Sequence, residues 1–212
     1  GISVDHYFHT SGCYSFAGCT SLKEVVIPDS VTGIGSRAFS GCTSLSKVKL
    51  SNNLAIIDEG TFSGCTSLAE IVIPDSVTGI GEYAFSGCTS LSKVKLSNSL
   101  TIIDAGTFSG CTSLTEIVIP DSVTEIGNDA FYRCTSLSKV KLSNNLTIIE
   151  AGTFRGCTSL TEITIPDGVT VIRGGMDVYD RNNGAFSGCT SLTEIVIPDS
   201  VTEIGSSAFS GC

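Results

Sequence analysis

The chain has 212 residues, a formal net charge of −9 and only 16% charged residues. This acidic balance argues against nucleic acid as a partner, because nucleic acids bind clustered lysine and arginine. No apolar run approaches the ~20 residues that a membrane-spanning helix needs. Because no secretory leader is recognisable at the start, we expect a mature product or a piece of a longer array.

A block of 23 residues recurs along almost the whole chain. A fixed period of this size is typical of a solenoid, in which each turn contacts only its neighbours. We therefore expect one domain over residues 1–212, with a partial N-terminal turn at 1–21 and eight repeats over 22–212. Each repeat opens with a leucine, namely Leu22, Leu45, Leu68, Leu91, Leu114, Leu137, Leu160 and Leu192.

The first segment, residues 1–21, only partly follows the repeat. Its residues 16–21 match the end of a copy, whereas residues 6–14 match nothing else in the chain. His6 and His9 could ligate a metal, but two ligands without a third are a weak signal. We expect a surface or cap segment here, and no metal or other cofactor.

Each copy begins with a strand pattern and ends with a short return segment. In the first copy Leu22, Val25 and Ile27 are the apolar positions, and period-two alternation with β-branched residues indicates a strand. Pro28 follows, and proline ends strand pairing because it has no N–H to donate. The return segment at 38–42 is too short for an isolated helix, so we expect one turn of α or 3₁₀ helix there.

Two kinds of copy, A and B, alternate along most of the chain and differ in charge. The third residue of each copy is glutamate in A and lysine in B, and the fifth is valine or threonine in A and lysine in B. Opposite charges on neighbouring strands stabilise a sheet by about 0.2–1 kcal/mol per pair, whereas like charges destabilise it. The two open readings are a neutralised, solvated face and a regularly spaced binding strip. Its lysines are Lys47, Lys49, Lys93, Lys95, Lys139 and Lys141.

The order of copies is A, B, A, B, A, B, A, A, so the last two break the alternation. Glu162 then neighbours Glu194, and Thr164 occupies the fifth position of the seventh copy. That copy also carries an insertion at residues 173–184, which must loop out and is of the kind that often binds. Two interpretations of this region remain open: a merely tolerated loop and a binding site. The binding site would be formed by Glu162, Thr164, Glu194, Arg173, Asp177, Tyr179, Asp180 and Arg181.

The cysteines recur at the repeat period, apart from Cys13. Thiols in register point the same way, whereas a disulfide needs Cβ atoms that face each other. We therefore expect a reduced column of buried cysteines beside the phenylalanines, because free cysteine packs as a small apolar residue. A disulfide between Cys13 and Cys19 is the remaining alternative, and the absence of any CxxC pair disfavours a metal site.

The recurring Leu, Pro, Ile, Phe and Cys positions resemble the BspA-like leucine-rich repeats of bacterial and protist surface proteins. The resemblance covers residues 14–212 except the insertion. It implies an α/β solenoid, a right-handed coil with a parallel β-sheet on the concave face and short 3₁₀ or α segments on the return side. It also implies an extracellular or cell-surface location, adhesion to host or matrix proteins, and no catalytic residues.

Three functions remain to be weighed. The first is a non-catalytic binding or adhesion module whose partner is a host or matrix protein, a glycan polymer or another copy. The second is a structural subunit that stacks through uncapped ends or edges into a fibre, since open strand edges invite pairing. An enzyme is disfavoured, because the sequence has no Ser-His-Asp set and no glycine-rich phosphate loop.

Overall fold

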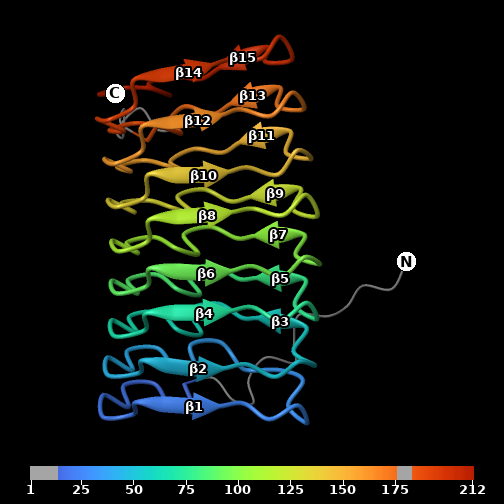
Figure 1. Ribbon diagram of the computed structural model, residues 1–212, viewed down its shortest axis with the longest axis vertical. Coiled ribbons are helices and arrows are strands. Elements are labelled where there is room, and N and C mark those ends of the chain that lie inside the picture. The colour runs from blue at the N-terminus through green and yellow to red at the C-terminus, as the bar shows by residue number, and fades with distance from the viewer. Residues whose placement is uncertain (1–13, 176–182) are drawn as a thin grey trace.

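Two columns of short strands run along the long axis of the molecule in the computed structural model, which describes residues 14–175 and 183–212 (Figure 1). The strands of the first column have three residues each. They are β1 (Glu24–Val26), β2 (Lys47–Lys49), β4 (Glu70–Val72), β6 (Lys93–Lys95), β8 (Glu116–Val118), β10 (Lys139–Lys141), β12 (Glu162–Thr164) and β14 (Glu194–Val196). The strands of the second column have two residues each. They are β3 (Ile56–Ile57), β5 (Gly79–Ile80), β7 (Ile102–Ile103), β9 (Glu125–Ile126), β11 (Ile148–Ile149), β13 (Val171–Ile172) and β15 (Glu203–Ile204).

All strand pairs are parallel, and equivalent residues of successive copies are partners. Glu24 pairs with Lys47 and Val25 with Val48, which confirms the 23-residue register predicted from the sequence. The first column is divided into the pairs β1-β2, β4-β6, β8-β10 and β12-β14 rather than one sheet. The second column, which the sequence did not suggest, forms the sheets β3-β5-β7-β9 and β11-β13-β15.

The return segments are turns, so the prediction of α or 3₁₀ helix there is wrong for the described residues. The N–H groups of one segment alternate between two kinds of acceptor. Phe39 donates to the carbonyl of Thr61 in the next copy at 2.9 Å, whereas Ser40 donates to Arg37 within its own segment at 3.0 Å. Because alternate N–H groups are committed to a neighbouring copy, no continuous helical ladder can form.

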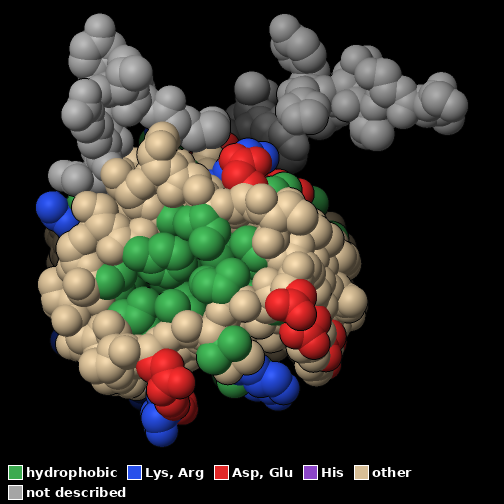
Figure 2. Space-filling model, turned by 90° about the horizontal axis from the view of Figure 1, so that it is seen from above, with side chains coloured by type: hydrophobic (Ala, Val, Ile, Leu, Met, Phe, Trp, Pro, Cys, Tyr) green, Lys and Arg blue, Asp and Glu red, His purple; other side chains and the backbone are tan. Residues whose placement is uncertain are grey.

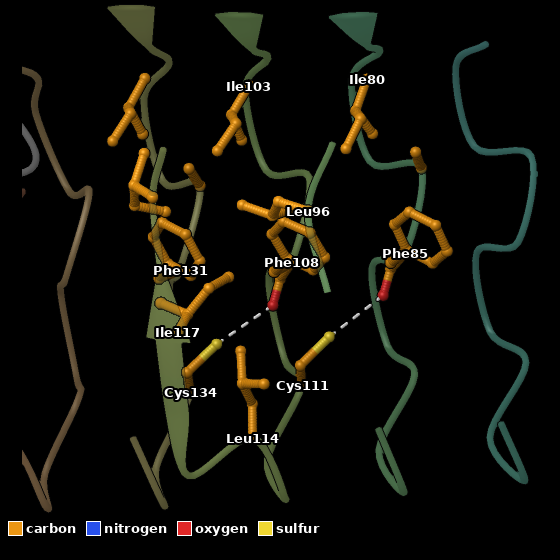
Figure 3. Close-up of a cluster of buried hydrophobic side chains, with 14 of the residues drawn as sticks. Ile80, Phe85, Leu96, Ile103, Phe108, Cys111, Leu114, Ile117, Phe131 and Cys134 are labelled. Atoms are coloured by element: carbon orange, nitrogen blue, oxygen red, sulfur yellow. Dashed lines mark hydrogen bonds between the residues drawn. The ribbon is translucent and has the colours of Figure 1, made fainter. Parts of the chain in front are cut away.

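Phenylalanine rings form an unbroken stack through the core. Ring centroids of successive copies lie 5.1–5.5 Å apart, with interplanar angles of 15° or less. This spacing lies in the range of favourable aromatic pairs. Figure 3 shows Phe85, Phe108 and Phe131 in this stack beside isoleucines and leucines of the same copies. The core predicted from the period is thereby confirmed, and it continues from Ile34 to Ala208.

The cysteine column also lies in this core. Cys65, Cys88, Cys111, Cys134, Cys157 and Cys189 are free thiols and are buried, as the period predicted. Each thiol donates a hydrogen bond to the carbonyl of the phenylalanine 26 or 35 residues earlier, at 3.1–3.3 Å. The sequence did not suggest these bonds. Cys13, His6 and His9 lie outside the described residues.

The insertion of the seventh copy leaves the stack intact. The Ala185 N–H donates to the Arg173 carbonyl at 3.1 Å, so the two described ends of the insertion are adjacent. The ring of Phe186 then resumes the stack, 5.4 Å from that of Phe154. No helix that could cross a membrane is present in the parts of the chain that the structure describes.

Candidate binding surface on the strands

The outward positions of the three-residue strands carry alternating charge. Lys93 is the Cα partner of Glu70, and Lys139 is the partner of Glu116, so acid and base alternate as predicted. At the fifth position, lysines of the B copies pair with exposed valines, as Lys141 does with Val118. Period-two alternation places the middle residue of each strand in the core and leaves its two neighbours facing solvent.

This face is hollowed over its C-terminal half. A hollow of about 600 Å³ lies over β8, β10, β12 and β14. Its charged lining residues are Glu116, Lys139, Lys141, Glu162 and Glu194. It therefore coincides with the end of the strip where the alternation of copies breaks.

The junction between the seventh and eighth copies concentrates negative charge. Glu162 is the Cα partner of Glu194, so two carboxylates neighbour each other on the exposed face. Like charges at partnered positions destabilise a sheet. Residue pairs that destabilise a fold locally are expected at functional sites, so this pair makes the hollow a candidate binding site.

A second position of the same junction also carries acid in both copies. At earlier A-to-B junctions an asparagine of the B copy donates a hydrogen bond to an aspartate of the preceding A copy. For example, the Asn144 N–H donates to Asp121 Oδ1 at 2.9 Å. That bond from the Asn144 backbone lowers the pKa of Asp121. The last junction has Asp199 in place of the asparagine and Asp167 in place of Asp121. The junction beneath the hollow is therefore the most acidic along the stack.

The predicted site residues fall into three groups. Glu162, Thr164, Glu194, Lys139 and Lys141 line the hollow. Four further lysines belong to the same column but lie on β2 and β6, outside the lining; they are Lys47, Lys49, Lys93 and Lys95.

The insertion residues are placed differently. Arg173 is not among the lining residues, and its Nε lies 3.9 Å from Glu150 Oε2. Asp177, Tyr179, Asp180 and Arg181 lie outside the described residues.

Sequence reasoning missed several lining residues of this surface, and three of them add charge or exposed apolar area to it. Glu116 lines the hollow, and so do Val118 and Val196, which are 59% and 68% exposed. A valine in the outward fifth position of every A copy except the seventh was the signal, because it leaves an apolar side chain in water. The hollow thus combines both signs of charge with apolar contact area.

This arrangement offers charged groups of both signs to a binding partner. Its carboxylates and ammonium groups lie on an open strand face, and they can pair with complementary charges of a partner. Among the described residues there is no group of three or more histidine, cysteine or acidic side chains that could hold a metal ion.

Stacked parallel strands, a 23-residue turn and a leucine and phenylalanine core define a leucine-rich-repeat solenoid. BspA-type leucine-rich repeat regions match residues 2–103, 60–180 and 176–212, and the chain belongs to this family. The resemblance seen in the sequence is thereby confirmed.

Three bacterial structures are similar to this chain. The leucine-rich repeat protein of T. pallidum has 32% identity and a TM-score of 0.67, over 86% of this chain and 72% of its own. A leucine-rich cell surface protein from Faecalibacterium prausnitzii has 34% identity and a TM-score of 0.59, over 93% of this chain and 59% of its own. A leucine-rich repeat protein from Eubacterium ventriosum has 28% identity and a TM-score of 0.60, over 90% of this chain and 59% of its own. No curated protein matches the chain.

Proposed function

We propose that this protein is a non-catalytic binding or adhesion module of a cell-surface or secreted protein. The observation that carries the proposal is the hollow over β8 to β14, which coincides with the break in the charge alternation. A relative that is described as a leucine-rich cell surface protein supports the location. The module would bind its partner on the strand face, whereas the phenylalanine and cysteine core would stabilise the fold.

The charges in the hollow favour a protein partner over a glycan polymer. Glu162 and Glu194 offer neighbouring carboxylates to a lysine or arginine of the partner, and Lys139 and Lys141 offer ammonium groups to acidic side chains. Val118 and Val196 add apolar contact. Protein interfaces combine these elements, with complementary charges that set register and apolar contacts that add affinity. A host or matrix protein with mixed charge fits this surface.

The test compares two double charge reversals with the same chemistry. Lys139→Glu/Lys141→Glu changes the hollow, and Lys47→Glu/Lys49→Glu changes the equivalent residues of β2, outside it. Binding would be measured against immobilised extracellular-matrix proteins and glycans. We expect binding to at least one matrix protein, lost in the first variant and retained in the second. Equal losses in both variants, or binding to glycans alone, would contradict the proposal.

A fibre-forming role is the second candidate, and one observation favours it. Apolar side chains gather on the end of the stack that Figure 2 shows. Ile204 of β15 is 51% exposed there, and Phe209 is only partly buried. A further repeat or a second copy stacked on this surface would cover it. Sedimentation velocity over a wide concentration range tests this role: elongated assemblies that grow with concentration support it, and a constant monomer contradicts it.

A further inference from the structure

Two neighbouring copies depart from the repeat at one place on the return side. Six copies end in Phe-Ser-Gly-Cys and the partial first turn in Phe-Ala-Gly-Cys. The fifth copy instead has Tyr132 and Arg133 between its phenylalanine and cysteine, and the sixth has Arg155 in place of the serine. The register brings the two changes together, since the Arg133 N–H donates to the Arg155 carbonyl at 2.8 Å.

Arg133 occupies a backbone conformation that suits glycine. Its φ is +56°, and the equivalent residue in eight other turns is a glycine with φ between +70° and +75°. A side chain in this left-handed region is disfavoured by its own Cβ. The stem of Arg133 also crosses the next turn above Gly156, where an added Cβ would lie 3.4 Å from the arginine Cγ. A residue held in an unfavourable conformation is a reason to look for a function.

Both guanidinium groups gather around the tyrosine. The Arg133 Cζ lies 5.1 Å from the centroid of the Tyr132 ring, and the Arg155 Cζ lies 5.2 Å from it. Cation–π contacts at these distances are attractive and hold the two like charges near each other. Arg155 Nη1 also donates to Asn183 Oδ1 at 3.4 Å. Arg155 is therefore positioned by both Tyr132 and Asn183, and Arg133 by Tyr132.

A second hollow, of about 350 Å³, opens beside this cluster. Tyr132, Arg133 and Arg155 line one part of it. The other part is lined by Ser187 and Ser210 with the glycines of the same turns. Its described lining residues carry two positive charges and no negative charge, in a chain whose net charge is −9. It shares no lining residue with the hollow on the strands.

We propose that this hollow binds an anionic saccharide through Arg133 and Arg155. A guanidinium group pairs with a carboxylate or a sulfate ester through two parallel hydrogen bonds. Ser187 and Ser210 can donate to and accept from sugar hydroxyl groups. The glycines between them have no side chains, so a flat ring can approach the backbone closely. One end of the ligand is thus anionic, and the rest is neutral and rich in hydroxyl groups.

This division of the hollow distinguishes a saccharide from an acidic peptide. A run of acidic residues would need basic groups along the whole length of the site. The arginines lie in the fifth and sixth copies only, and the seventh and eighth contribute serine and glycine. In such a saccharide a charged sugar would contact the arginines, and its neutral neighbours would contact the serines and glycines.

The test restores the repeat sequence at the cluster. Arg133→Gly and Arg155→Ser each introduce the residue that most other turns have, so both variants should fold, and Arg133→Gly also removes the unfavourable φ. Binding of a hyaluronan hexasaccharide, in which neutral sugars separate the carboxylate-bearing ones, neutral maltohexaose and hexaglutamate would be measured by calorimetry. We expect the hyaluronan hexasaccharide to bind, and each variant to weaken that binding at least about tenfold.

Two further variants serve as controls. Arg37→Ser removes the same charge far from the hollow, and Lys139→Glu/Lys141→Glu alters only the strand-face hollow; both should bind the hexasaccharide as the parent does. Failure of the strand-face proposal would therefore leave this result unchanged. No binding of the hyaluronan hexasaccharide, equal binding of maltohexaose, tighter binding of hexaglutamate, or unchanged affinity in Arg133→Gly would each overturn the proposal.

Discussion

The Cys134 thiol donates a hydrogen bond to the carbonyl oxygen of Phe108, 3.1 Å away and 26 residues earlier in the chain (Figure 3). The same bond recurs between neighbouring turns along the stack, as from Cys111 to Phe85 at 3.3 Å. The Phe108 carbonyl also accepts the Cys111 N–H at 3.1 Å, so each thiol is a second donor to a buried carbonyl of the preceding turn while it packs against the core. The recurrence of cysteine at the repeat period therefore has a structural cause that requires neither disulfides nor metal.

We predict that Cys111→Ala destabilises the protein by about 1–3 kcal/mol. The change leaves a small cavity and removes the thiol donor of the buried Phe85 carbonyl. Cys19→Ala is the matched control, because Cys19 is exposed, and its free energy of unfolding should match that of the parent. Urea denaturation measures both, and equal values for the two variants would contradict the role given to the bond.

Stability should fall in alkaline solution because of the same thiols. Burial raises the pKa of Cys65, Cys134 and Cys189 from an ordinary value of 9.0 to about 12. Between these values the unfolded chain loses thiol protons that the folded chain keeps, so the free energy of unfolding decreases as pH rises from 9 towards 12. Below pH 9 these groups contribute no pH dependence.

Denaturation at pH values of about 7.5, 9 and 10.5 measures this effect. The decrease should be smaller in Cys134→Ala, which lacks one buried thiol, than in Cys19→Ala, which lacks an exposed one. A constant free energy of unfolding across this range would show that the thiols are not buried as described.

Phe108→Ala should cost about 3–5 kcal/mol, because its ring is fully buried between those of Phe85 and Phe131. Phe16→Ala should cost much less, since Phe16 is 49% exposed and, among the described residues, stacks only on Phe39. Chemical denaturation of the two variants decides the point. Similar losses of unfolding free energy at both positions would be inconsistent with a stack whose rings are buried at its centre and exposed at its end.

Glu194→Lys should stabilise the protein slightly, by about 0.2–1 kcal/mol, because it turns the Glu162–Glu194 pair into an acid–base pair. Lys47→Glu should have the opposite sign, because it places an acid beside Glu24. Both effects should shrink as salt rises, since exposed charges are screened. Melting temperatures at low and high salt would test this, and shifts of the same sign in the two variants would count against the charge alternation.

Gly106→Ala should destabilise the protein by more than about 1 kcal/mol. Gly106 has a φ of +61°, and an added Cβ would collide with the ring of Tyr83 from the preceding copy. Gly33→Ala is the control, because nothing lies within 4 Å of a Cβ added there and its φ is not positive. If thermal melts showed equal losses for both, the packing of Tyr83 over Gly106 would be wrong.

Much of the fold followed from the period alone. Equal spacing of Leu, Phe and Cys fixes which residues are neighbours in a stack, and the Glu–Lys pairing followed from the alternation of copies. The turn structure of the return segments could not be predicted in this way. The acceptors of the Phe39 and Ser40 N–H groups depend on tertiary contacts, since Phe39 donates to the next copy and Ser40 within its own segment. The second column of strands was missed for the same reason: Gly79–Ile80 has no strand pattern of its own and is ordered by Ile56–Ile57 and Ile102–Ile103 beside it.

The candidate site was only partly predictable. The break in alternation identified Glu162 and Glu194, but the sequence gives no measure of how the strand face is hollowed, so Glu116 and Val118 were missed. Tyr132 and Arg133 depart from the repeat in the sequence. Their role in a site depends on φ at Arg133 and on the position of Arg155 one turn away, which only the structure gives.

The central claim is that equivalent residues of successive copies lie above one another in one stack, so that each turn depends only on its neighbours. Deleting residues 68–113, one A and one B copy, tests it most directly, because the A–B order is preserved and Tyr83 and Gly106 leave together. The account predicts a folded protein with one cooperative urea transition and a slope of unfolding reduced by roughly a fifth, in proportion to the surface removed. A deleted chain that is unfolded would contradict it.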